Sequence, residues 1–389
     1  MKHYYLFIIA VVFAVFLNTE ILPSMGYDTM LVTIAFMPMM AYIGLGILYK
    51  KITISTRYSK DAVHLLIMAA LIIALKYGAG QNYFKKMIEF LIIPAIVSVC
   101  FDFLTAKEYS VIRKTMIIFF VCECGLSLLE KMTGNNYFFN NADMEYFKEL
   151  GMHRASSFLG HPLANSMFVA VFMAFVAISD FKKIYFQVFL VLFGYIALFC
   201  FGGRGATLVV TIFLVPYFYL KLNKIIRKRK WILNLGVICV VFGMLYLFSE
   251  TELGARFQKT DQGEGSTKTR FEVLQFYKFY NNDEQFYWGH PDNYQYMMRK
   301  LGAAGVENGV ITLILDYGII LTIPLLILLF KFHWHKLSVF PARGKWLVIL
   351  VFYLVGNMNP NLAKPLMWVL WIFSYYAFKP ELSSGKNKT

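Results

Sequence analysis

Charged residues are scarce in this chain, and acidic residues are the scarcest of them. Only 16% of the 389 residues are Asp, Glu, Lys or Arg, with 23 acidic against 38 basic side chains. Soluble domains carry about 25% charged residues, so this composition excludes an ordinary water-soluble domain. Instead, 58% of the residues are hydrophobic and the mean hydropathy is +0.56. We therefore expect a single integral membrane domain over residues 1–389.

Cysteine is also scarce, and its placement excludes a disulfide or metal framework. Cys122 and Cys124 form a CxC pair, but two residues apart on a helix they point in nearly opposite directions. Neither His161 nor His290 has metal-ligand spacing with another His or Cys, and no paired carboxylates suggest Mg²⁺. The sequence therefore implies no metal and no cofactor. All five cysteines lie in long apolar runs: Cys100, Cys122, Cys124, Cys200 and Cys239.

Long apolar runs fill the chain in place of the missing charge. Residues 4–22 are long enough to cross a hydrocarbon core of roughly 30 Å at 1.5 Å per helical residue. They have no small-residue cleavage site, so we expect a retained first span rather than a signal peptide. The prediction is an all-α polytopic membrane protein of about twelve transmembrane helices, the last two sharing a break at NMNPN, 357–361. The expected spans are 4–22, 29–49, 62–80, 87–105, 112–130, 162–180, 184–202, 205–222, 231–249, 308–330, 346–357 and 365–378.

The basic residues concentrate in the loops that lie inside if the N-terminus is cytoplasmic. The densest cluster is KLNKIIRKRK at 221–230. Lys and Arg orient membrane proteins by staying on the cytoplasmic side, so the formal net charge of +15 is explained without nucleic acid as a partner. Both termini are then cytoplasmic, and the polar segment 380–389 is expected to be a disordered tail.

The same topology places two long segments outside, 131–161 and the large loop 250–307. Arg154 and Arg270 lie in them, and Arg204 lies in the outer turn FGGRGAT. A guanidinium binds phosphate oxygens bidentately and keeps its charge, so these arginines are candidates for an anionic site. Alternatively, each one snorkels at the end of a span or pairs with a loop carboxylate.

Glycines and histidines adjoin these arginines. Gly203 and Gly205 let the backbone near Arg204 approach a ligand and expose N–H groups, or else they form a plain turn between packed spans. His161 precedes Pro162, which suits the first turn of a helix whose positive dipole end favours an anion. His161, and likewise His290, is a candidate donor to a phosphate or sugar hydroxyl. The alternative for each histidine is a capping contact.

The run VENGVITLILDYG begins the tenth predicted span with polar residues. Asn308, Thr312 and Asp316 recur every four residues and predict a polar stripe running inward from the outer surface. Glu307 at its mouth is a candidate general base, or else a carboxylate favoured by the helix dipole. Glu123, within the fifth span, is a weaker candidate, and a Lys or Arg on a neighbouring span is its expected partner.

In their order along the chain, these motifs resemble the O-antigen polymerase and ligase superfamily, most closely the Wzy-type polysaccharide polymerases. The resemblance begins near the fifth span. It rests on Arg154 with GHPLAN, GGRGA around Arg204, TRFEV at Arg270, WGHPDN, and the Glu-Asn pair of VENGV. GGRGA lacks the Ser that usually precedes this arginine. Glu307 stands where ligases tend to have histidine, which favours a polymerase.

The resemblance implies a metal-independent glycosyltransferase with a GT-C-like bundle in the bacterial cytoplasmic membrane, its active site facing outward. It would join undecaprenyl-pyrophosphate-linked oligosaccharide repeats into O-antigen or capsular polysaccharide. Membrane lipid, a chain-length regulator and a flippase would be its partners. Arg154, Arg204 and Arg270 would bind pyrophosphate, while Glu307, His290 and His161 would be catalytic. Supporting residues would be Gly203, Gly205, Asn165, Asn308 and Asp316.

Two other functions fit parts of the pattern. A flippase or solute transporter would also have about twelve spans, a broken helix and buried polar residues, but it would place its polar groups near mid-membrane. A ligase would pass the glycan to a different acceptor. In this sequence the polar residues gather toward one face, which favours the polymerase.

Overall fold

The computed structural model describes residues 2–17, 32–48, 56–138, 153–225, 272–278, 280, 283–301 and 306–380. These ranges are helical and contain no strand, which confirms the all-α prediction. Twelve spans are not confirmed, because four of the described helices are long and apolar enough to cross a membrane. The predicted span 231–249, the tail 381–389, most of 250–307 and residues 139–152 lie outside the described ranges. The four helices are Lys60–Gly78, Ile184–Phe201, Arg204–Ile225 and Gly309–Val339; shorter apolar helices are Tyr4–Phe16, Met37–Leu48, Pro162–Ile178 and Pro365–Phe378.

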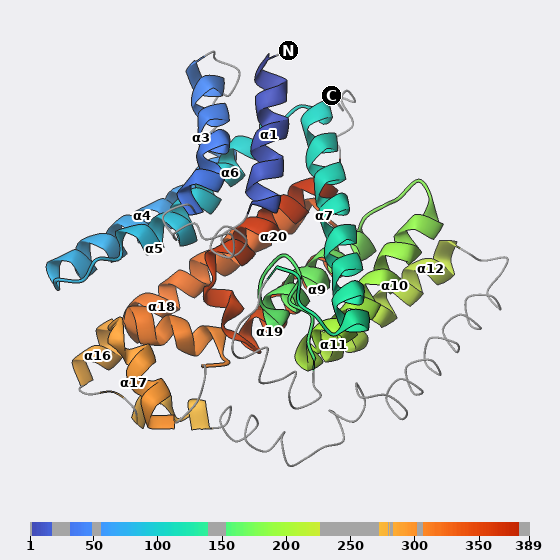
Figure 1. Ribbon diagram of the computed structural model, residues 1–389. Helices are drawn as coiled ribbons and strands as arrows, with labels where there is room; N and C mark the ends of the chain where they lie inside the picture. Colours follow the sequence, from blue (N-terminus) through green and yellow to red (C-terminus); the bar gives the residue numbers. More distant parts are fainter. Residues whose placement is uncertain are drawn as a thin grey trace.

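The helices form one bundle with a small helical group at its edge (Figure 1). Two π-helical turns, η2 (Ile88–Ile92) and η3 (Val210–Leu214), continue α5 into α6 and α11 into α12. The principal elements are α1 (Lys2–Phe16), α3 (Val32–Leu48), α4 (Thr56–Gly78), α5 (Phe84–Met87), α6 (Ile93–Phe101), α7 (Ala106–Thr133), α9 (Pro162–Ile178), α10 (Ile184–Phe201), α11 (Arg204–Val209), α12 (Val215–Ile225), α16 (Asp283–Trp288), α17 (Asp292–Leu301), α18 (Gly309–Lys336), α19 (Ala342–Asn357), η7 (Pro360–Ala363) and α20 (Pro365–Phe378).

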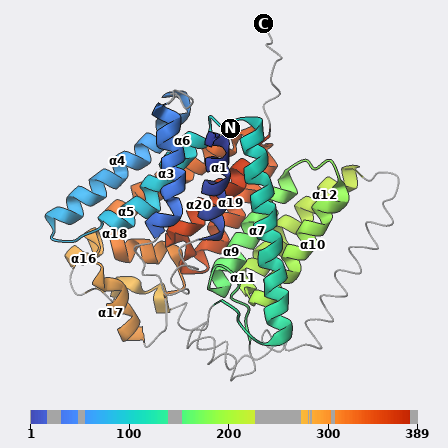
Figure 2. The same ribbon diagram turned by 45° about the horizontal axis from the view of Figure 1, so that its top comes forward.

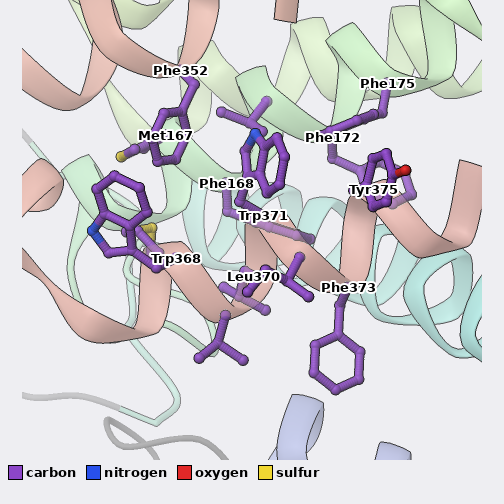
Figure 3. Packing of buried hydrophobic residues seen from close by; sticks show 14 of the residues in the cluster. Met167, Phe168, Phe172, Phe175, Phe352, Trp368, Leu370, Trp371, Phe373 and Tyr375 are labelled. Carbon is purple, nitrogen blue, oxygen red and sulfur yellow. The ribbon is translucent and has the colours of Figure 1, made fainter. Parts of the chain in front are cut away.

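Helices α9 and α20 form the centre of the core. Both begin with proline, whose fixed φ suits a first helical turn, and their residues are almost all buried. Trp371 of α20 stacks on Tyr375 with ring centroids 5.7 Å apart, and meets Phe175 of α9 edge-on at 5.7 Å. Figure 3 shows these rings between the two helices. Because both helices are apolar on every face, they must be enclosed by other helices.

Helix α7 borders this core and has well-defined ends. Thr105 and Glu108 form a capping box at its start, and Gly134, at φ 67°, ends it in the left-handed conformation. Cys122 is exposed and Cys124 is buried, as their spacing on a helix predicts. Figure 2 shows α7 running past α9 and α10 along the bundle.

Helix α18, predicted as a regular span, is interrupted at Gly318. This residue has φ 76° and ψ 164°, and a Cβ there would lie 2.2 Å from the carbonyl oxygen of Tyr287. Gly289, at φ 72°, makes the reciprocal close approach, because a Cβ added to it would lie 2.3 Å from the nitrogen of Gly318. Two glycines therefore let α16 and α18 meet backbone to backbone. Both views show α16 and α17 beside α18 (Figures 1 and 2).

We expect Gly318→Ala to destabilise the folded chain by more than about 2 kcal/mol, because the new methyl group meets backbone and the left-handed φ strains alanine. The matched control is Gly125→Ala within α7, where an added Cβ meets nothing within 4 Å. That change should be neutral or stabilise by about 1 kcal/mol. The midpoint of thermal unfolding in detergent measures both, and equal midpoints for the two variants would contradict the prediction.

Candidate functional site

The segment 153–161 crosses the end of the bundle as irregular, largely buried backbone. Glu130 of α7 accepts hydrogen bonds from the backbone nitrogens of Ser156 at 2.8 Å and Ser157 at 2.9 Å. Its other oxygen accepts from the nitrogen of Tyr137 at 3.0 Å. One buried carboxylate therefore satisfies three backbone donors that no helix serves. Ser157 is held at φ 38°, an uncommon value for a residue with a side chain.

Two further buried side chains hold the same segment. Glu123 accepts from the nitrogen of Phe158 at 3.2 Å. Its expected partner was a cation on a neighbouring span, and the described partner is instead this backbone N–H. Asn165 of α9 donates to the carbonyl oxygen of Ser156. Asn165, predicted as a supporting residue, therefore acts on the backbone that carries Arg154.

His161 is the N-cap of α9, and its surroundings are cationic. Its Nδ1 accepts from the nitrogen of Leu163 at 3.2 Å, which assigns the proton of the neutral ring to Nε2. Burial, Lys364 and Arg154 together lower the pKa of His161 to about 4. The neutral imidazole therefore presents an N–H donor beside two positive charges. The N-capping alternative is confirmed, and it leaves Nε2 as a donor.

The glycines around Arg204 are explained by helix packing. A Cβ on Gly203 would lie 2.2 Å from the Ser166 hydroxyl oxygen, and one on Gly205 would lie 2.7 Å from the Met358 sulfur. The nitrogens of Gly203 and Arg204 bond to carbonyls of Leu198 and Gly202, so neither points at an open anion site. These contacts place half-buried Arg204 between the start of α9 and the turn after α19.

The turn 357–364 lies between α19 and α20 and contacts the start of α18. Gly309 packs against it, since its added Cβ would lie 2.5 Å from the Cβ of Leu362. The side-chain oxygen of Asn357 accepts from the nitrogen of Val310 at 3.0 Å, which fixes the start of α18. Glu307 and Asn308 are half-buried just before that start, and Asn308 caps it by accepting from Ile311. The predicted break at 357–361 is confirmed.

Four helices therefore begin around this turn. Their N-caps are His161 for α9, Gly203 for α11, Asn308 for α18 and Lys364 for α20. The N-terminal end of a helix carries a partial positive charge, which favours a bound anion. We call this region the N-terminal cluster, defined by Arg154, His161, Arg204, Glu307, Asn308 and Lys364.

Asp316 and His290 lie in a second group at the interruption of α18. Asp316 is buried and pairs with Lys86 at 2.5 Å. Lys76 of α4, also buried, donates to the carbonyl oxygens of Trp288 at 2.5 Å and Gly289 at 2.8 Å. The backbone nitrogen of His290 donates to the Leu315 oxygen at 3.0 Å. We call this group the lysine pair site.

The two groups are joined along α18. Asp316 lies two turns beyond Asn308, with Thr312 between them, so the predicted polar stripe is one helix face. Thr312 donates back to the Asn308 carbonyl at 2.9 Å, and the stripe ends at Gly318, where α18 is interrupted. Arg270, the third predicted pyrophosphate ligand, lies outside the described residues.

Sequence reasoning missed the lysines of both groups. Lys364 directly precedes Pro365, which begins α20, and Lys86 lies in the short link before the predicted fourth span. Lys76 carried a usable signal, because a lysine inside an otherwise apolar run needs a partner at membrane depth.

Comparisons with family models, with curated proteins and with solved structures give no match to this chain. The N-terminal cluster combines fixed positive charge, a neutral N–H donor and one carboxylate. Such a combination can bind a diphosphate and accept a proton from a hydroxyl group.

We expect His161 to make stability depend on pH between 6.5 and 4. In that window the unfolded chain binds a proton on His161 that the folded chain excludes, so the free energy of unfolding falls as the pH falls. Above pH 6.5 the imidazole is neutral in both states and contributes no such dependence. His161→Asn keeps an N-cap acceptor and should lose less stability than wild type between pH 7 and 5.

Thermal unfolding of wild type and His161→Asn at both pH values measures this difference. His64→Asn is the control, because His64 is exposed, and it should follow wild type. An identical pH dependence in wild type and His161→Asn would refute the assignment.

Proposed function

We propose that this chain is a membrane glycosyltransferase that polymerises lipid-pyrophosphate-linked oligosaccharide repeats, with undecaprenyl pyrophosphate as the lipid carrier. The observation that carries the proposal is the convergence of four helix N-termini on the turn 357–364, together with Arg154, Arg204 and Lys364. This arrangement suits a ligand with more than one negative charge, since the helix dipoles and the side-chain charges act in the same direction.

The chemistry follows from stabilising the leaving group. The bond between the anomeric carbon of the growing glycan and the pyrophosphate oxygen breaks, and its electron pair leaves with the pyrophosphate. Arg154, Arg204 and Lys364 would stabilise that charge, and Nε2 of His161 would donate a hydrogen bond to it. The acceptor hydroxyl oxygen forms the new glycosidic bond, and its proton passes to Glu307.

Two residues of the proposal come from the sequence resemblance. Arg270 would add a third arginine from the large loop 250–307. His290, at the lysine pair site, would be a further catalytic residue, as the resemblance implies. The proposed orientation places both groups on the outer face of the bacterial cytoplasmic membrane, with both termini inside.

A transporter of lipid-linked oligosaccharide is the second candidate, and one observation favours it. The interrupted helix α18, with Asp316, Lys86 and Lys76 around the break, has the broken-helix geometry on which transporter sites are built. The N-terminal cluster, by contrast, supplies a base and leaving-group stabilisation that transport does not need.

The test is reconstitution of the purified chain with a lipid-pyrophosphate repeat unit, resolving the glycans on a gel. Wild type should give a ladder of multiples. Arg154→Ala and Lys364→Ala should each slow transfer by roughly 10- to 100-fold, the loss of one charge-assisted hydrogen bond. Lys331→Ala is the control, because Lys331 is exposed on α18 and far from the cluster in sequence.

Each alternative gives a different result. Movement of intact lipid-linked sugar across the bilayer without a ladder would replace the polymerase by a transporter. Transfer of a single repeat to a separate lipid acceptor would replace it by a ligase. A normal ladder from Arg154→Ala would remove Arg154 from the site.

A further inference from the structure

A second basic region lies at the opposite ends of the same helices. A cavity of about 800 Å³ is lined by the ends of α9, α12 and α20 and by the start of α19. Among the described residues, five basic side chains and one carboxylate, Asp180, line it. The basic residues are Arg113, Lys182, Lys221, Lys224 and Arg343.

Two of the five cations are already bound to helix ends. Nε of Arg113 donates to the carbonyl oxygen of Ala377 at 2.6 Å, at the end of α20. Lys221 donates to the Ala177 oxygen at 3.1 Å, at the end of α9, and pairs with Asp180 at 3.2 Å. These contacts offset the negative ends of α9 and α20.

The other three cations bind no helix end among the described residues. Lys182, Lys224 and Arg343 are exposed, and Asp180, the carboxylate of the described lining, is taken by Lys221. The described part of the cavity therefore carries an excess of positive charge. A multiply charged or phosphate-bearing anion is the complementary ligand.

The start of α19 adds backbone donors to this excess. Its N-cap is Pro341, which makes no side-chain capping hydrogen bond, and Pro341, Ala342 and Arg343 all line the cavity. The first N–H groups of this 16-residue helix therefore lie beside the arginine. Gly344 permits this placement, because its added Cβ would lie only 3.1 Å from Ile178.

The cavity also has an apolar side that continues onto the outside of the bundle. Phe340, Phe378 and Leu220 line it. Leu220 is 54% exposed, and on the same continuous helix Leu208 and Ile212 are 55% and 53% exposed. A ligand with a phosphate head and hydrocarbon chains matches both parts, whereas a free anion matches only the basic part.

We propose that this cavity binds the head group of an anionic phospholipid, with its acyl chains along the exposed side of α11 and α12. The positive-inside orientation puts the cavity at the cytoplasmic leaflet, where basic pockets between helices meet anionic head groups. The site is separate from the N-terminal cluster, so it does not depend on the proposed glycosyl transfer.

The test uses the purified full chain in a neutral detergent and measures its thermal midpoint as lipid is titrated. Cardiolipin and phosphatidylglycerol should raise the midpoint, and phosphatidylcholine should not. In the variant carrying both Lys224→Glu and Arg343→Glu, the lipid concentration needed should rise at least about tenfold. Lys331→Glu reverses an exposed charge outside the cavity and should behave as wild type.

Titrations with glycerol phosphate and inorganic phosphate test whether the cavity binds a free anion rather than a lipid. Stabilisation by either one equal to that by cardiolipin would overturn the lipid assignment in favour of a soluble phosphate. An equal loss in Lys331→Glu, or equal stabilisation by phosphatidylcholine, would overturn the site itself.

If the double variant does not fold, Lys182→Gln with Lys224→Gln replaces it, and lipid retained through purification is compared by native mass spectrometry. Less anionic lipid than in wild type is then expected, and an equal amount would overturn the site.

Discussion

The bundle depends on side chains that form hydrogen bonds to its buried, non-helical backbone. N–H and C=O groups buried in the protein have no water to bond to, so a buried segment that leaves helical geometry needs partners from side chains. Glu130 serves three such donors and Glu123 a fourth. At the interruption of α18, the hydroxyl of Tyr83 donates to the Asp316 carbonyl at 2.9 Å, and the amide of Asn293 donates to the Leu315 carbonyl at 3.2 Å. Each of these polar side chains therefore stabilises a specific departure from the helix.

These departures determine where the N-terminal cluster lies. A helix that starts within the bundle directs its positive end into it, and at α9 and α18 side chains bond the first N–H groups. The turn 357–364 places such a start, α20, beside the starts of α9, α11 and α18. Arg154 lies near these helix starts because Glu130 and Asn165 form hydrogen bonds to the segment that carries it. The N-terminal cluster is therefore a product of the backbone hydrogen bonds, and its basic side chains are added to a region that is already positive.

Local patterns predicted particular helix starts, faces and breaks, but they did not predict contacts between residues far apart in the sequence. Pro162 as a helix start, the opposite faces of Cys122 and Cys124, and the break at 357–361 follow from neighbouring residues, and all are confirmed. The pairing of Lys86 with Asp316 joins residues 230 positions apart, so no periodicity reveals it. Gly318 lies in an apolar run whose pattern predicts an uninterrupted helix, and its left-handed φ occurs where the backbone of Gly289 comes close. Glu123 was expected to pair with a cation, but it accepts a hydrogen bond from the backbone of Phe158. The sequence does not show which backbone segment lies beside it.

The two basic regions differ in how deeply their cations are buried, and this difference matches the two roles proposed for them. In the N-terminal cluster Arg154, Arg204 and Lys364 are half-buried, while burial and the positive surroundings lower the pKa of His161 to about 4. Such fixed charges are suited to a reacting group, since they need little reorganisation as charge develops. In the cavity at the other end, Lys182, Lys224 and Arg343 are exposed and border apolar surface. Long exposed side chains lose conformational freedom when they bind, which suits retention of a lipid that exchanges with the bilayer rather than catalysis. The positive charge of the chain is thus divided between half-buried cations, which we propose bind the substrate, and exposed cations, which we propose contact lipid.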